Sequence, residues 1–138
     1  MKRRTIVISR VLMVLYFAAL AYLCFGHFSN MPKVPRIILG FEADKIVHFA
    51  MFLPFPILFY LSAGREYSKI WQGCLFAAFI FVSGCMIGAG TELMQGICTD
   101  YRTPDIADFK ADAAAIAFSS VIVFLSIIIR IIKKNITG

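Results

Sequence analysis

Nine polar side chains lie at the edges of long apolar segments, and their types and spacing could support chemistry. Carboxylates and an imidazole can transfer protons or hold a cation, whereas lysine and arginine can hold an anionic group. Charged groups are costly beside hydrocarbon, so we take them as candidates for a functional site. The candidate ligand-binding residues are Asp44, Lys45, His48, Glu92, Gln95, Arg102, Asp105, Asp108 and Asp112.

The segments that must position these side chains are apolar enough to be membrane helices. Of the 138 residues, 60% are hydrophobic and the mean hydropathy is +0.81, far above an ordinary soluble domain. Crossing roughly 30 Å of hydrocarbon takes about 20 residues in a helix. The sequence predicts an all-α, four-helix transmembrane bundle that forms one domain over residues 1–138. The expected helices span approximately residues 6–26, 45–62, 70–96 and 104–132.

Two of these helices carry small residues and carboxylates on one face. At 100° per residue, Glu92 follows Gly84 and Gly88 on one face of the third helix. The corresponding face of the fourth helix comprises Asp105, Asp108, Asp112, Ala115 and Ser119. Small residues allow helices to approach closely, so the carboxylates above them should converge. The alternative is that these acids are solvated loop charges.

The second expected helix begins with polar residues and is interrupted by prolines. Asp44 is expected to cap its N-terminus. Lys45 is opposed there by the helix dipole, so it should reach lipid phosphate or pair with an acid of another helix. For His48 three roles stay open: a structural histidine, a member of the polar site, or a metal ligand. Pro54 and Pro56 remove backbone donors and should kink the helix near mid-membrane.

The distribution of basic residues predicts the orientation. Most of the 14 Lys and Arg residues fall on one side if the helices alternate, and basic loops face the cytoplasm. We therefore expect a multi-pass protein with both termini in the cytoplasm. We attribute the net charge of +6 to orientation and expect no nucleic-acid partner. The four cysteines form no C-x-x-C pair, and we expect neither a bound metal nor a cofactor.

Three ordered motifs resemble the VanZ-like family. The segments "DKIVHFAMF", "TELMQ" and "RTPDIAD" are similar to its Asp-Lys-x-x-His-Phe, Glu-x-x-Gln and Arg-then-Asp-and-Asp motifs. The resemblance covers the chain except the first helix and the tail. Asp112 departs from it because the family has Asn there, and Ala115 and Ser119 stand where the family has Gly. The additional carboxylate should be protonated or bound to Lys45 or Arg102.

The resemblance implies a small bacterial cell-envelope protein of the inner (cytoplasmic) membrane. The family's namesake is associated with resistance to teicoplanin, a glycopeptide antibiotic with a lipid tail. We therefore expect an outer-face polar site that binds a lipid head group, an envelope precursor or a lipoglycopeptide, and a contribution to teicoplanin resistance. The expected partner is a membrane lipid or lipid-linked envelope molecule, and oligomerisation stays open. Phe49, Phe52 and Phe55 would line an apolar slot or pack in the ordinary way.

We favour a binding function, and two other functions stay open beside it. One is an interfacial enzyme, with or without a metal, that acts on a lipid-linked envelope substrate through His48, Glu92 and Asp108. The other is proton-coupled transport through the carboxylates, for which four helices make a thin pathway. In each case Glu92 should lie within reach of Arg102 or Lys45, because an unpaired carboxylate beside hydrocarbon is costly.

Overall fold

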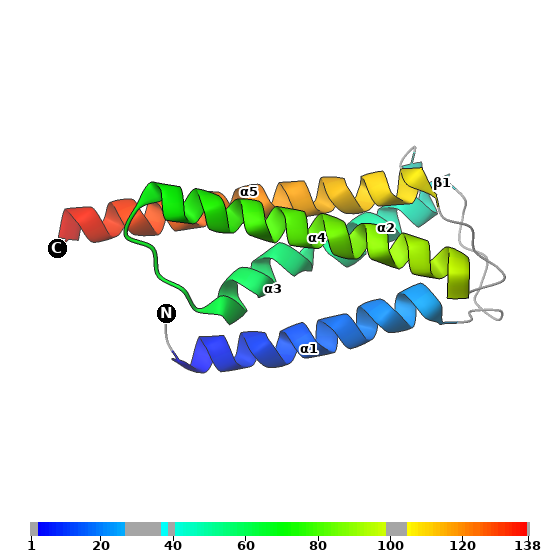
Figure 1. Cartoon of the computed structure of the whole chain (residues 1–138), viewed down its shortest axis with the longest axis horizontal. Coiled ribbons are helices and arrows are strands. Elements are labelled where there is room, and N and C mark those ends of the chain that lie inside the picture. The colour runs from blue at the N-terminus through cyan, green and yellow to red at the C-terminus, as the bar shows by residue number, and fades with distance from the viewer. Residues whose placement is uncertain (1–2, 27–36, 39–40, 99–104, 138) are drawn as a thin grey trace.

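The computed structural model describes residues 3–26, 37–38, 41–98 and 105–137, most of which are helical (Figure 1). Two-residue strands, β1 (Ile37–Ile38) and β2 (Phe41–Glu42), pair antiparallel just before the second helix. The helices are α1 (Arg3–Phe25), α2 (Ala43–Phe52), α3 (Pro54–Ala63), α4 (Ile70–Cys98) and α5 (Ile106–Thr137).

Four helical segments of the described chain are long and apolar enough to cross a membrane: α1, α2 together with α3, α4, and α5. Their outer surfaces expose large apolar side chains such as Val14, Met86 and Ile129, as a lipid-facing surface requires. The predicted all-α, four-helix transmembrane architecture is confirmed. The largest shift of a helix end is in α5, which continues beyond the expected end at residue 132 to Thr137.

The second membrane span breaks between α2 and α3, where the sequence predicts a kink. Leu53 separates the helices, and Pro54 at the start of α3 has no backbone N–H to donate. Polar side chains from the neighbouring helices donate to carbonyls at this break. Ser119 Oγ of α5 donates to the Leu53 carbonyl at 2.7 Å, and the Tyr16 hydroxyl of α1 donates to the Met51 carbonyl at 3.0 Å. The break is therefore tied to the bundle on both sides.

Glycines on α4 set how closely α5 and the second span approach it. A Cβ added to Gly84 would lie 2.8 Å from Cγ2 of Ile116 and 3.1 Å from the Phe55 ring. A Cβ added to Gly88 would lie 3.4 Å from Cβ of Asp112. The close approach predicted from the small-residue face is confirmed, and it forms the most extensive helix pair of the bundle, α4 with α5.

The hydrophobic core extends along the contact between α4 and α5. One buried group, with Ile80 and Ile127, lies towards the end where α5 terminates, and another, with Phe52, lies towards the start of α5. Ala115 and Ser119 are fully buried. Their small side chains, in place of the glycines of the resembled family, thus still allow α5 to pack against its neighbours.

The two ends of the bundle differ in charge. The start of α1, the end of α5 and the connection from α3 to α4 lie at one end (Figure 1). We call it the basic end, because it carries Arg3, Arg4, Arg65, Lys69, Arg130, Lys133 and Lys134. The opposite end, where α2 and α5 begin and α4 terminates, we call the acidic end. That α1 begins and α5 ends on the same side is confirmed, and the assignment of that side to the cytoplasm stays a prediction.

Candidate functional site

Four buried ionisable side chains from three helices meet inside the acidic end. They are His48 of α2, Glu92 of α4, and Asp108 and Asp112 of α5, with exposed fractions of 2%, 6%, 7% and 0%. We call these four residues the histidine–carboxylate cluster. Ionised groups at such depth are stable only when partners offset the loss of water, so the contacts of each one matter.

The His48 ring is the centre of the cluster. Its Nδ1 lies 3.1 Å from Oδ1 of Asp112, within hydrogen-bonding distance, and 3.5 Å from Oε1 of Glu92. Its Nε2 lies 3.7 Å from Oδ2 of Asp108. Both nitrogens of the ring therefore face a carboxylate, and which nitrogen carries the proton depends on the tautomer.

Helix geometry explains why these residues converge. Gly88 lies one turn before Glu92 on α4 and lets α5 approach, which places Asp112 beside the same face. Asp108 and Asp112 are four residues apart and therefore share a face of α5. His48 enters from the buried side of α2. The predicted convergence of the carboxylates is confirmed, and for these residues the interpretation as solvated loop charges is wrong.

Glu92 also organises the start of α5. Its Oε2 accepts a hydrogen bond from the backbone N–H of Asp105 at 3.2 Å. Asp105 in turn accepts the backbone N–H of Ala107 through Oδ1 at 2.8 Å, which satisfies a donor that has no partner within the first helical turn. Because Oε2 is held in this way, Oε1 is the oxygen that faces His48.

Three carboxylate oxygens of the cluster have no hydrogen-bond donor among the described residues. They are Glu92 Oε1, Asp108 Oδ1 and Asp112 Oδ2. A buried acceptor without a donor destabilises a fold by about 1–3 kcal/mol. One imidazolium can offset only one of three carboxylate charges, and Lys45 approaches only Asp108 among them. The described residues therefore leave the cluster short of positive charge and donors.

Lys45 lies at the rim of the cluster. Its ammonium pairs with the carboxylate of Glu42 and lies 3.8 Å from Asp108 Oδ1 and 3.9 Å from Asp105 Oδ2. The expectation that Lys45 pairs with an acid of another helix is confirmed. Sequence reasoning misses Glu42 as a member of the rim, although its position three residues before Lys45 is a usable signal.

Asp44 is not the N-cap of α2. The residue at the cap position is Glu42, whose side chain makes no capping hydrogen bond, and Asp44 lies within the first turn. α2 begins at Ala43, directly after the two-residue strand pair, which is two residues earlier than capping by Asp44 requires. A carboxylate oxygen of Asp44 and donor atoms of His48 and Asp108 lie within 4.8 Å of one another, so Asp44 belongs to the exposed rim.

Gln95 lies on the buried face of α4 but is directed elsewhere. Its Nε2 donates to the carbonyl of Cys24 at 3.1 Å, which ties α4 to the end of α1. The carboxylates of Glu92 and Asp112 contact His48, and no contact joins either of them to Lys45 in the described part of the chain. Arg102 lies outside the described residues, so its pairing with an acid stays a prediction.

The aromatic residues of the second span pack in the ordinary way. Phe52 and Phe55 are each 1% exposed and belong to the core, whereas Phe49 is exposed on the outer surface of α2. These three rings do not line a common slot, because two of them are buried in the core and the third faces outwards.

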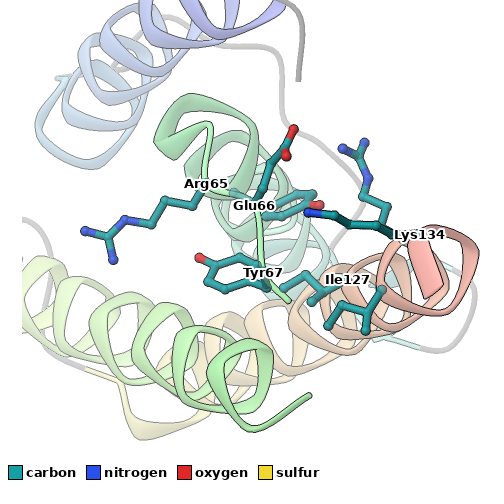
Figure 2. A pocket seen from close by; sticks show the side chains of 8 residues that line it. Arg65, Glu66, Tyr67, Ile127 and Lys134 are labelled. Atoms are coloured by element: carbon teal, nitrogen blue, oxygen red, sulfur yellow. The ribbon is translucent and has the colours of Figure 1, made fainter. Parts of the chain in front are cut away.

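A cavity of about 220 Å³ lies at the opposite, basic end (Figure 2). Its walls include Tyr60, Arg65, Tyr67, Ile127, Arg130 and Lys134. Figure 2 shows Arg65 extending away from Lys134, so their charges do not converge on one point. The convergent ionisable groups are those of the acidic end.

Comparisons with protein-family models, with curated proteins and with solved structures find no match to this chain. The function of the chain must therefore be inferred from the cluster itself.

Proposed function

We propose that this chain is a VanZ-like membrane protein of the bacterial envelope that binds the polar head of an amphiphilic molecule at its acidic end. The observation that carries the proposal is the histidine–carboxylate cluster, which lies at the ends of membrane-spanning helices and has three buried oxygens without a donor among the described residues. The resemblance supports the proposal further, because its three motifs supply His48, Glu92 and Asp108, which meet at one place.

The charge of the cluster limits the class of head group. Lys45 is already surrounded by Glu42, Asp105 and Asp108, so a phosphate that entered alone would meet more negative than positive charge. The bound molecule must therefore bring donors, positive charge, or a cation that binds with it. Lipid head groups, lipid-linked envelope precursors and lipoglycopeptides such as teicoplanin offer amine or hydroxyl groups of this kind.

For such a ligand the acidic end faces outwards and the basic end, with both termini, faces the cytoplasm. The concentration of Lys and Arg at the basic end supports this orientation. The cluster then lies in the outer leaflet of the inner membrane, where a lipoglycopeptide or envelope precursor arrives. Binding there would contribute to teicoplanin resistance by withholding the antibiotic or its target.

Native mass spectrometry of the full-length protein in detergent tests this proposal. The wild type should retain a native lipid or added teicoplanin, because the unpaired acceptors gain donors on binding. Asp112→Asn preserves side-chain size and removes one charge. This variant should retain at least about tenfold less of the lipid or teicoplanin, which corresponds to a loss of about 1.4 kcal/mol in binding free energy. Glu66→Gln removes an exposed carboxylate at the basic end and serves as the control. Retention by Asp112→Asn equal to that of the wild type would refute the proposal.

An interfacial enzyme is the second candidate, and the surroundings of His48 favour it. An imidazole held by Asp112 at 3.1 Å, with Glu92 at 3.5 Å, is a plausible general acid and base for a lipid-linked substrate. Turnover separates the two functions. Product formation that His48→Gln abolishes would support an enzyme, whereas retention of an unchanged ligand would support binding.

A further inference from the structure

Two of the three unpartnered oxygens belong to carboxylates that approach the same nitrogen of His48. These carboxylates are Glu92, on α4, and Asp112, on α5, and the nitrogen is Nδ1. We infer that His48 Nδ1, Glu92 and Asp112 together bind a divalent transition-metal ion, Zn²⁺ or Mn²⁺. The inference deepens the proposed function and rests on it only for the head group that contacts the ion.

The separations of the three donors suit one shared ion. Bonds of about 2.1 Å place neighbouring ligands roughly 3.0–3.4 Å apart in octahedral or tetrahedral geometry. Nδ1 of His48 lies 3.1 Å from Asp112 and 3.5 Å from Glu92. Donor atoms of the three residues all lie within 4.8 Å of one another. Each ligand comes from a different helix, which is why the linear sequence shows no metal-binding motif.

Two of the three ligands, His48 and Glu92, also have a partner that orients them. Nε2 of His48 faces Asp108 Oδ2 at 3.7 Å, where the carboxylate favours the tautomer with its proton on Nε2 when Nδ1 binds a metal. Asp108 is in turn 3.8 Å from the Lys45 ammonium. Glu92 is held through Oε2 by the backbone N–H of Asp105. Such outer partners are typical of metal-binding histidines and carboxylates.

A divalent ion also balances the charges of the cluster. Its two positive charges offset the carboxylates of Glu92 and Asp112, while Lys45 offsets Asp108. With a protonated His48 in place of the ion, Glu92 and Asp112 would share one buried cation. An uncompensated buried charge destabilises a protein by several kcal/mol. Nitrogen and oxygen donors together favour Zn²⁺ or Mn²⁺ over Ca²⁺.

Three protein ligands leave at least one coordination position for an outside oxygen. In the proposed function, that position takes an oxygen of the head group. The metal ion bound by the protein then supplies the positive charge that a negatively charged head group needs at this site, so the ligand does not have to bring a cation of its own.

The experiment uses the full-length protein in detergent, treated with EDTA, dialysed, and titrated with ZnCl₂ or MnCl₂ alone. We expect about one ion per chain by elemental analysis and a higher unfolding temperature with the ion than with MgCl₂. Absence of a stoichiometric ion in the wild type would overturn the inference, whatever the variants do. This measurement does not depend on whether any variant folds.

Variants then identify the ligands. Asp112→Asn and Glu92→Gln should each weaken Zn²⁺ or Mn²⁺ binding at least tenfold, and Asp108→Asn about tenfold with the stoichiometry unchanged, as for an orienting carboxylate. Glu66→Gln removes an exposed carboxylate at the basic end and should leave the affinity unchanged. Equal weakening by Glu66→Gln and Asp112→Asn would mean that binding depends on net charge rather than on the cluster, and would overturn the inference.

Amphiphile retention measured with and without EDTA separates this inference from the proposed function. If no ion binds but Asp112-dependent retention persists in EDTA, the metal inference fails and the proposed function stands. If one ion binds with the expected ligand dependence and no amphiphile is retained, the inference stands and the proposed function fails.

Discussion

At the basic end the cationic side chains are long and lie near the surface, whereas at the acidic end short carboxylates are buried between helices. Arg65, Arg130 and Lys134 are exposed, and Arg130 lies over the Tyr60 ring at 5.7 Å from its centroid. At the acidic end, by contrast, Asp112 has no exposed surface at all.

Side-chain length explains this contrast. Lys and Arg can lie along apolar surface and still place their charge in water, so a cation near a helix end needs no protein partner. Asp and Glu cannot reach as far, and a carboxylate one or two turns inside a helix end stays buried. Exposed cations therefore report orientation, whereas buried carboxylates require a partner. The following predictions test this contrast, beginning with the largest effect.

The largest effect is expected in thiol labelling of introduced cysteines. It should be all or none, because it depends on which end of the bundle faces outwards. In a background without the native cysteines, Glu42→Cys at the acidic end should react with a membrane-impermeant thiol reagent in intact spheroplasts. Lys69→Cys at the basic end should react only after lysis. Both positions are exposed, so reagent access alone does not separate them. The reverse pattern would contradict the proposed orientation and the outer-leaflet site.

The second prediction concerns the packing that holds the acidic end together. Gly88→Leu leaves every charge in place but adds a side chain where even a Cβ would lie 3.4 Å from Asp112 and 3.7 Å from Phe52. Overpacking of this kind should lower the free energy of unfolding by roughly 1–3 kcal/mol and reduce membrane abundance. Gly90→Leu is the matched control, because a Cβ at Gly90 would meet nothing within 4 Å. Equal losses in both variants would contradict the predicted role of Gly88.

The third prediction separates charge from packing at the same place. Glu92→Gln keeps the side-chain size and an oxygen that can accept the Asp105 N–H. In EDTA it should be as stable as the wild type or more stable by about 1 kcal/mol, because a buried charge without a full partner is removed. It should nonetheless lose any change in teicoplanin susceptibility that the wild type confers on a sensitive host.

Abundance measured by immunoblot provides the control for Glu92→Gln. If the variant disappears from the membrane as Gly88→Leu should, Glu92 is a packing residue. If it keeps full activity at normal abundance, its charge has no role in function.

The local pattern of the sequence predicts the helices, the break at the prolines and the shared faces, because each depends on residues close in the chain. The spacing of Gly84, Gly88 and Glu92, for example, is enough to predict a close contact beneath a carboxylate. Spacing cannot predict which partner each charge selects. Glu92 and Asp112 meet His48 rather than Lys45, since that choice depends on how three helices rotate and pack together.

Asp44 and Gln95 illustrate the same limit. The helix α2 begins at Ala43, directly after the two-residue strand pair, rather than at Lys45, so Asp44 lies in the first turn and not at the cap position. Gln95 shares a helical face with Glu92, yet it contacts the end of α1, because it lies almost one turn farther along α4. Neither effect is visible without the tertiary arrangement.

The smallest effect is expected at the basic end, at Tyr67. Its hydroxyl is buried without a hydrogen-bond partner among the described residues, so Tyr67→Phe should raise the free energy of unfolding by at most about 1 kcal/mol. Burial also raises the pKa of Tyr67 from 10.0 to about 12. Folded protein therefore keeps this proton between pH 10 and 12 while unfolded chain releases it, and stability falls as pH rises through that window. Chemical denaturation at pH 9 and 11.5 should show a smaller fall in Tyr67→Phe than in the wild type or in Tyr22→Phe, at an exposed tyrosine of α1. Identical falls in all three would mean that the Tyr67 hydroxyl is hydrated, and that the basic end buries no unpaired polar group comparable to those of the cluster.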